Sequence, residues 1–161
     1  MAKVIIVAGS RSDLSVIRES GLIKPLDAAG ISCSLSVASA HRNPREVAAL
    51  AMNNIDDALV FIGVAGLAAA LPGALAGATE MQVTVIGVPL DVHGIDSCLY
   101  MPPGVPVLSC GVGKAGLKNA GIAAAQIAAR TTAEREAFSI WLDENAKDAE
   151  INIDLAEIRE D

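Results

Sequence analysis

The sequence predicts an α/β domain, in which a doubly wound parallel sheet is covered by helices on both faces and followed by an extra C-terminal helix. Short apolar runs rich in Val and Ile alternate along the chain with segments rich in Ala, Leu and Glu. The apolar runs are continuous, which is typical of parallel strands buried on both faces. Alternating strands and helices form right-handed βαβ units, so we expect a flavodoxin-like or Rossmann-like three-layer sandwich.

The expected elements follow from these runs and from the segments between them. The predicted strands, in chain order, are Lys3–Ala8, Ser32–Val37, Ala58–Val64, Thr84–Val88 and Val105–Cys110. The predicted helices are Leu14–Ala29, Pro44–Asn53, Leu71–Gly77 and Lys118–Ala129. Gly21 and Pro25 lie inside the first helix, and a proline removes a helical hydrogen bond, so we expect this helix to be interrupted.

We expect a single domain over residues 1–161, with its core in residues 3–129 and a C-terminal helix and acidic tail in residues 131–161. Thr131 followed by Glu134 is typical of a capping box, in which two side chains bond the free N–H groups at a helix start. This helix is predicted to run to about Asp148. The acidic tail, Ile151–Asp161, is expected either to be mobile or to lie on a neighbouring subunit.

The composition is unusually apolar for one small domain. Of the 161 residues, 52% are hydrophobic but only 2% are aromatic. A chain of this length cannot bury so much apolar surface alone, so we expect other copies of the chain to cover part of it. No apolar run reaches the ~20 residues that a membrane span requires, so no membrane contact is expected.

The charge and the cysteines exclude several classes of protein. The formal net charge of −7 argues against nucleic acid, whose binders carry a basic patch, but it allows a local site for an anionic small molecule. Cys33, Cys98 and Cys110 form no CxxC pair, which predicts neither a disulfide framework nor a zinc site. We therefore expect a cytoplasmic protein that needs no metal or other cofactor.

The segment Gly9–Asp13, with the sequence Gly-Ser-Arg-Ser-Asp, connects the first strand to the first helix. Gly9 permits a tight turn, and Ser12 or Asp13 can cap the helix that follows. One interpretation is therefore only a capped turn. The other is a binding site, in which hydroxyl and backbone N–H groups hold a phosphate while Asp13 accepts hydrogen bonds from sugar hydroxyls.

His41 and Arg42 follow the second strand, directly after Ser39 and Ala40. A histidine at a strand end is either an ordinary loop residue or a proton-transfer group that titrates near neutral pH. The neighbouring guanidinium favours the second interpretation, because it suits a phosphate. Pro44 fits the first turn of the next helix.

Two further segments follow strands. Gly63–Gly73 contains no ionisable side chain, and it is either a tight turn packed on its neighbours or an apolar wall that holds carbon dioxide and excludes water. The proline-dense segment Gly87–Pro106 is expected to be a rigid loop. Its histidine, His93, is expected to be an exposed surface residue.

Taken together, these segments resemble the PurE family, which includes aminoimidazole ribonucleotide carboxylase and carboxyaminoimidazole ribonucleotide mutase. The resemblance covers roughly Val4 to Ala129, and several motifs in the right order are far more specific than one. The motifs are Gly9-Ser10-x-Ser12-Asp13, Ser39-Ala40-His41-Arg42-x-Pro44, Ala68-Ala69-x-Leu71-Pro72-Gly73, Gly87-Val88-Pro89, Met101-Pro102-x-Gly104-x-Pro106-Val107 and Gly113-Lys114-Ala115-Gly116-x-x-Asn119-Ala120.

The resemblance implies an enzyme that transfers a carboxyl group onto the imidazole ring of aminoimidazole ribonucleotide, from a carbamate or from carbon dioxide, in de novo purine biosynthesis. The serines of the family's first motif lie near the phosphate and its Asp binds the ribose, which implies these roles for Ser10, Ser12 and Asp13. The family's Arg binds phosphate and its His transfers a proton, which implies these roles for Arg42 and His41.

The remaining implied contacts come from the same motifs. Gly9, Ser39 and Ala40 are expected to bind the substrate, and Gly66 and Ala68 to lie against the imidazole and the carboxyl group. Family members are typically octamers whose sites take residues from neighbouring subunits. A homo-octamer is therefore expected.

Two features differ from the family pattern. Family members commonly carry a His directly before Leu-Pro-Gly, where this chain has Ala70, and the segment from Asp96 to Met101 is shorter than usual. These changes motivate one alternative, a relative that acts on another heterocyclic nucleotide. A second alternative, from another class of protein, is a non-catalytic oligomer that binds a nucleotide. His41 beside Arg42 argues against the second, because binding alone needs no titrating group.

Overall fold

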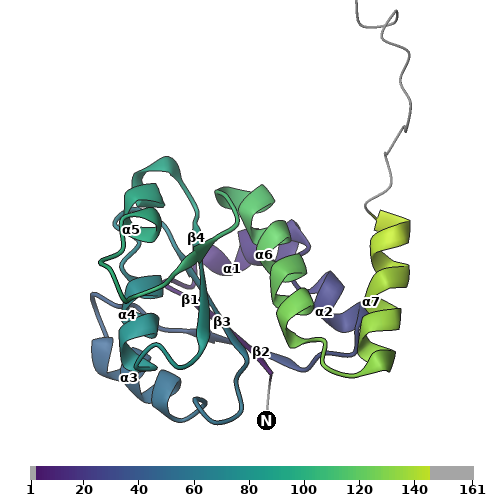
Figure 1. Ribbon diagram of the computed structural model, residues 1–161. Helices are drawn as coiled ribbons and strands as arrows, with labels where there is room; N and C mark the ends of the chain where they lie inside the picture. Colours follow the sequence, from purple (N-terminus) through teal and green to yellow (C-terminus); the bar gives the residue numbers. More distant parts are fainter. Residues whose placement is uncertain (1–2, 146–161) are drawn as a thin grey trace, which may run out of the picture.

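The computed structural model describes residues 3–145 and has a five-stranded sheet at its centre (Figure 1). The strands are β1 (Val4–Ala8), β2 (Cys33–Val37), β3 (Val60–Ala65), β4 (Thr84–Pro89) and β5 (Leu108–Ser109). They pair in the order β2-β1-β3-β4-β5, and every pair is parallel. This order is the flavodoxin-like one, so the predicted doubly wound sheet is confirmed.

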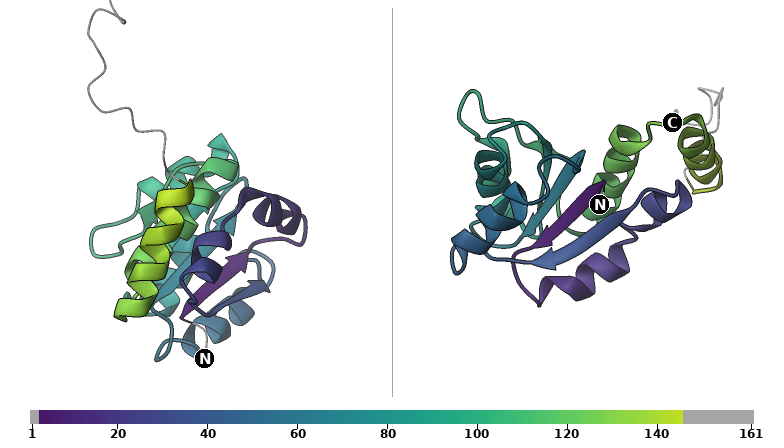
Figure 2. Two further views of the ribbon diagram at one scale, coloured as in Figure 1. Left: turned by 90° about the vertical axis from the view of Figure 1, so that its right-hand side faces the viewer. Right: turned by 90° about the horizontal axis from the view of Figure 1, so that it is seen from below.

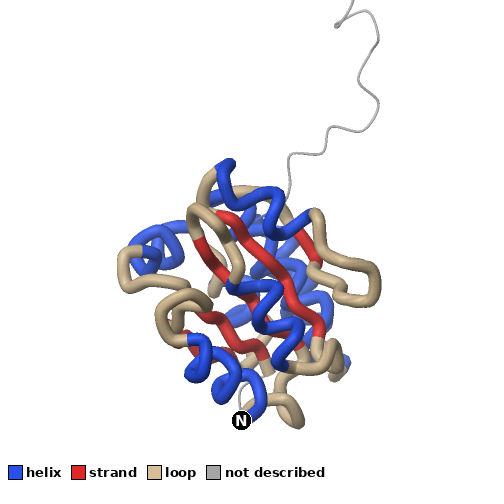
Figure 3. The backbone as a smooth tube through the Cα atoms, turned by 90° about the vertical axis from the view of Figure 1, so that its left-hand side faces the viewer, coloured by secondary structure: helices blue, strands red, loops and turns tan. Residues whose placement is uncertain are grey.

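Helices cover both faces of the sheet (Figures 1 and 2). The helices are α1 (Asp13–Ser20), α2 (Lys24–Ala28), α3 (Pro44–Met52), α4 (Leu71–Ala78), η1 (Val92–Gly94), α5 (Ile95–Leu99), α6 (Gly113–Ala128) and α7 (Thr132–Asn145). Helices α3, α4 and α5 lie on one face, which Figure 3 shows from outside, with the strands behind them. Helices α1, α2 and α6 lie on the other face, and α7 packs outside them against α2.

The alternation of side chains along the central strands divides the core in two. Val4 and Ile6 of β1 face the cluster under α1, α2 and α6, whereas Ile5 and Val7 face the cluster under α3 and α4. Every residue of β1 and β3 is buried. Continuous apolar runs are therefore required in these strands, as the sequence indicated.

The first predicted helix is interrupted as expected. Helix α1 ends before Gly21, whose φ of +77° is left-handed and favours glycine, and α2 begins three residues later with Pro25 in its first turn. The capping box of α7 is also confirmed. The Thr131 hydroxyl accepts a hydrogen bond from the Glu134 N–H at 3.2 Å, and the Glu134 carboxylate accepts one from the Thr131 N–H at 2.9 Å. The expected end of this helix near Asp148 and the acidic tail lie outside the described residues.

Most boundaries differ from the prediction by one or two residues, and larger differences occur in the second half of the chain. Strand β5 spans Leu108–Ser109 rather than Val105–Cys110, because Pro106 has no N–H to donate to a neighbouring strand. Helix α6 begins at Gly113 rather than Lys118. The expected loop between Gly87 and Pro106 contains η1 and α5, since its prolines lie on either side of these two helices and interrupt neither.

Among residues 3–145, no helix is both long enough and apolar enough to cross a membrane.

Candidate active site

The order of the strands places the candidate site. The chain moves outward in opposite directions from β1 and β3, so the loops that follow these strands separate and leave a crevice at the carboxyl edge of the sheet. A cavity of about 530 Å³ lies there, within the ~300–1,000 Å³ typical of small-molecule sites. Its lining comes from the loops after β1, β2 and β3.

The loop after β1 is held by its own side chains. The Asp13 carboxylate accepts a hydrogen bond from the Ser10 N–H at 2.9 Å, and the Ser12 hydroxyl donates to the Ser10 hydroxyl at 2.9 Å. Neither Ser12 nor Asp13 caps a later N–H of α1, which corrects the expected cap: Asp13 bonds backward because it is already the first residue of the helix. The three side chains therefore gather at the start of α1, facing the cavity.

The loop after β2 is tied both to itself and to the loop after β1. The Ser39 N–H donates to the Asn43 side-chain oxygen at 2.7 Å, and the Ser39 hydroxyl accepts from the Arg42 N–H at 3.3 Å. The Arg42 guanidinium donates to the Gly9 carbonyl at 3.1 Å, which bridges the two loops. His41 is exposed to the cavity beside it.

The loop after β3 supplies an apolar wall. Gly66, Leu67, Ala68, Ala70 and Leu71 line the cavity and contribute no ionisable side chain. Leu67 has a φ of +54°, a left-handed conformation that is uncommon for a side chain of this size. Its N–H donates to an oxygen of Asp91, which follows β4, at 2.9 Å.

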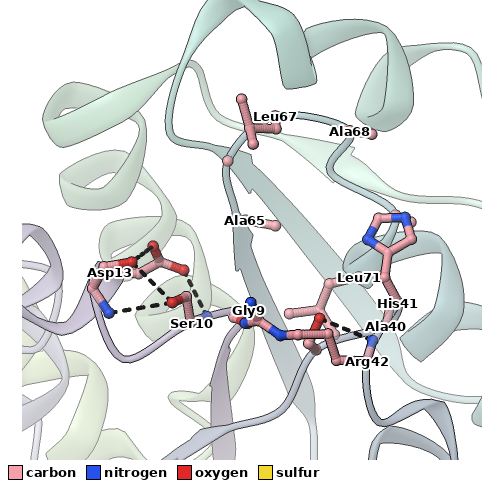
Figure 4. Close-up of a pocket in the computed structure, with 14 residues that line it drawn as sticks. Gly9, Ser10, Asp13, Ala40, His41, Arg42, Ala65, Leu67, Ala68 and Leu71 are labelled. Atoms are coloured by element: carbon pink, nitrogen blue, oxygen red, sulfur yellow. Dashed lines mark hydrogen bonds between the residues drawn. The ribbon is translucent and has the colours of Figure 1, made fainter.

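Figure 4 shows how these groups are distributed. Ser10 and Asp13 lie at one end of the cavity and His41 at the other, while the Arg42 side chain extends toward Gly9 between them. Leu67 and Ala68 lie on the remaining wall. The cavity therefore has a polar end with hydrogen-bonding groups, a central cation, and an end where one imidazole meets an apolar wall.

All ten residues predicted from the sequence line this one cavity. They are Gly9, Ser10, Ser12, Asp13, Ser39, Ala40, His41, Arg42, Gly66 and Ala68. His93 is exposed in η1 and does not line it, as expected. The predicted site residues did not include Ala65, Leu67, Ala70 and Leu71, although they lie in the segment Gly63–Gly73 that was interpreted as a possible apolar wall. Asp91 was not singled out, although it follows a predicted strand as the other site residues do.

Comparison with known proteins gives the family. A family model described as AIR carboxylase matches residues 3–148. The chain belongs to the AIR carboxylase family. This membership confirms the resemblance that the motifs indicated.

Two relatives in this family carry the name of a mutase. The chain is 38% identical over 129 residues to the N5-carboxyaminoimidazole ribonucleotide mutase of Methanocaldococcus jannaschii, covering 78% of each chain. It is 39% identical over 135 residues to the enzyme of that name from Haemophilus influenzae, covering 80% of each. The crystal structure of Treponema denticola PurE superposes with a TM-score of 0.73 at 27% identity, covering 89% of this chain and 90% of that one.

No three His, Cys, Asp or Glu side chains gather into a possible metal site within residues 3–145. That the enzyme needs no metal or cofactor stays a prediction.

Proposed function

We propose that this member of the AIR carboxylase family is an N5-carboxyaminoimidazole ribonucleotide mutase, which moves a carboxyl group from the exocyclic nitrogen to a ring carbon of the imidazole in de novo purine biosynthesis. The observation that carries this proposal is the convergence of three separate loops on one cavity with a single imidazole. The names of the curated relatives favour the mutase over the carboxylase that uses free carbon dioxide.

The nucleotide would be held by the loops after β1 and β2. Arg42 and the serines at the start of α1 suit a phosphate, because a guanidinium and a helix start with free N–H groups both favour an anion. Asp13 suits the ribose, since a carboxylate accepts hydrogen bonds from two hydroxyls. The hydrogen bond from Arg42 to the Gly9 carbonyl supports this arrangement, because it orders both loops around one ligand.

His41 would move the proton. The carbamate nitrogen takes a proton from the His41 imidazolium as its bond to the carboxyl carbon breaks, which gives carbon dioxide and the aminoimidazole. The nucleophilic ring carbon then attacks carbon dioxide, and the new tetrahedral carbon carries both hydrogen and carboxylate. His41 removes that hydrogen as a proton, which restores the aromatic ring and the imidazolium. The proton balance is closed, so one titrating group is sufficient.

The apolar wall would retain the intermediate. Carbon dioxide has to stay in the cavity between the two steps, and Gly66, Leu67 and Ala68 offer water no hydrogen-bonding side chain there. Ala70 also lines this wall, which makes it more apolar than a histidine would.

The assembly and the location of the enzyme belong to the same proposal. Ten large hydrophobic side chains among the described residues are exposed, including Tyr100 at 81% and Leu67 at 71%. Burying them against other copies of the chain is favourable, so we expect a homo-oligomer, with eight subunits by the family resemblance. A cytoplasmic enzyme fits the absence of paired cysteines.

The test is an ultraviolet assay of the purified protein under two conditions. In one the substrate is the carbamate of aminoimidazole ribonucleotide, and in the other it is aminoimidazole ribonucleotide together with bicarbonate. We expect turnover of the carbamate, and we expect His41→Asn to abolish turnover while the affinity for the nucleotide stays within about twofold. His93→Asn is the matched control, because it changes the other histidine of the chain, which lies outside the cavity.

Other outcomes would contradict the mutase. Turnover with bicarbonate alone would show a carboxylase, and turnover only with a different heterocyclic ribonucleotide would show a changed substrate. Nucleotide binding without any turnover in the wild type would favour a non-catalytic oligomer. Equal activity of the wild type and His41→Asn would exclude His41 as the proton-transfer residue.

A further inference from the structure

Asp91 lies beside the cavity but does not line it. Its carboxylate joins two segments of the chain that meet there. Asp91 lies two residues after the end of β4, and each oxygen of its carboxylate accepts a backbone hydrogen bond. One accepts from the Leu67 N–H at 2.9 Å, and the other accepts from the His93 N–H at 2.9 Å. The carboxylate therefore connects the loop after β3 to the helical turn η1.

These bonds also favour the charged form of Asp91. The Leu67 N–H is the largest cause that holds the pKa of Asp91 below its usual value, and the His93 N–H adds to it. A charged acceptor makes a stronger hydrogen bond than a neutral one.

The loop that Asp91 holds contains an unfavourable backbone conformation. Leu67 has a φ of +54°, a left-handed conformation in which the leucine Cβ crowds the following carbonyl oxygen. The Leu67 side chain is 71% exposed, so its own packing does little to offset that crowding. The hydrogen bond to Asp91 is the interaction that fixes its backbone.

Close packing also holds the segment after β4 against the loop after β3. A Cβ on Gly66 would lie 3.0 Å from the Asp91 carboxylate oxygen, so glycine allows the carboxylate to approach this backbone closely. A Cβ on Gly94, at the end of η1, would lie 2.9 Å from the Ala69 Cβ and 3.0 Å from the Leu67 carbonyl oxygen. The segment after β4 thus covers the loop after β3 from the side away from the cavity.

We propose that Asp91 is a positioning residue, which holds the Gly66–Ala68 loop as a rigid apolar wall against the reacting end of the substrate. The inference rests on the proposed function, because that function puts the imidazole and the carboxyl group at this wall. The nucleotide end is built from the loops after β1 and β2, which Asp91 does not touch. Losing Asp91 should therefore slow the reaction while nucleotide binding is retained.

The two test variants are Asp91→Ala and Asp91→Asn. Asparagine keeps the shape but has one oxygen, so it can accept only one of the two backbone bonds and turns an N–H toward the other. Asp57→Asn is the matched control, because Asp57 is exposed in the loop before β3, at the opposite edge of the sheet.

The first measurement is hydrogen–deuterium exchange of the Leu67 amide, which needs no substrate. We expect at least tenfold faster exchange in both Asp91 variants and no change in Asp57→Asn. Unchanged exchange at Leu67 would overturn the proposal.

The second measurement separates kcat from binding at a temperature well below unfolding. We expect kcat to fall about ten- to a hundredfold in both variants, as misplacement of groups near the chemistry does, with the Kd for aminoimidazole ribonucleotide within about twofold. A lowered Tm with kcat unchanged would show a merely structural role and overturn the proposal, as would equal losses in kcat and affinity. A wild type without turnover would refute the proposed function instead, and the exchange measurement would still decide whether Asp91 holds the loop.

Discussion

Arg42 has two tasks that a lysine cannot perform together. Its guanidinium donates to the Gly9 carbonyl at 3.1 Å, and its remaining N–H groups are available to a phosphate in the same cavity. Lysine carries the same charge but as a compact ammonium without the planar fork. We therefore expect Arg42→Lys to weaken nucleotide binding about tenfold, with a smaller change in kcat.

Isothermal titration calorimetry with aminoimidazole ribonucleotide measures this loss. Arg45→Lys is the control, since Arg45 lies three positions further along the chain in α3, is exposed, and does not line the cavity. Equal affinities of the two variants would show that Arg42 does not contact the nucleotide.

Residues of the site could be predicted where the chemistry follows a strand directly in the sequence. Gly9–Asp13, Ser39–Arg42 and Gly66–Ala68 each follow a predicted strand, and parallel strands bring such loops to one edge. The contact between Asp91 and Leu67 could not be predicted in this way. It depends on a left-handed φ at Leu67 and on the packing of two loops, neither of which leaves a pattern in the sequence.

At the scale of elements, the start of α7 is fixed by one carboxylate. Glu134 forms an ion pair with Lys3 and accepts hydrogen bonds from the N–H groups of Arg130 and Thr131. The Lys3 ammonium is the first cause, and these N–H groups the next, that lower the pKa of Glu134 from 4.5 to about 2. Helix α7 is thereby attached to the residue that precedes β1.

This lowered pKa predicts how stability depends on pH. A carboxyl whose pKa is depressed by folding contributes stability that is fully present above its unfolded pKa and lost as the pH falls toward its folded value. We therefore expect Glu134→Gln to be less stable than the wild type at pH 7. The difference should shrink below about pH 4.5 and disappear near pH 2.

Urea unfolding followed by tryptophan fluorescence tests this, because the one tryptophan, Trp141, lies on α7 and stacks on Phe138. Glu136→Gln, on the exposed side of the same helix, is the control. A difference between Glu134→Gln and the wild type that stays constant from pH 7 to pH 2 would contradict the assignment.

The elements themselves were predictable to different degrees. Strands β1, β3 and β4 were found because each is a nearly continuous apolar run. Strand β2 alternates apolar residues with serine and lies at the edge of the sheet. Strand β5 was predicted too long, and helix α5 was not predicted, because two residues of strand and five of helix are too short to impose a period on the sequence. Tertiary contacts decide such short elements, and β5 forms only because β4 offers it an unpaired edge.

At the scale of the whole molecule, four of the ten exposed large hydrophobic side chains among the described residues lie on segments near the candidate site. Leu67 lies in the loop after β3, Val92 in η1, and Leu99 and Tyr100 at the end of α5, with exposures of 57–81%. The contact between Gly94 and the Leu67 carbonyl brings η1 against that loop, and α5 continues directly from η1. A contiguous apolar surface beside a binding site is typical of an interface.

We expect this surface to lie between subunits of the proposed oligomer. Sedimentation velocity should give a mass that is a multiple of 16.4 kDa, and the Tm should rise with protein concentration because association stabilises the folded chain.

Tyr100→Lys should shift the protein toward smaller species, since a charge buried without a partner in an apolar contact is costly. Met81→Lys is the control, because Met81 is 46% exposed but lies after α4, near the amino end of β4. A wild type that sediments as a 16.4 kDa monomer at micromolar concentration would refute the oligomer, and an unchanged mass for Tyr100→Lys would place the interface elsewhere.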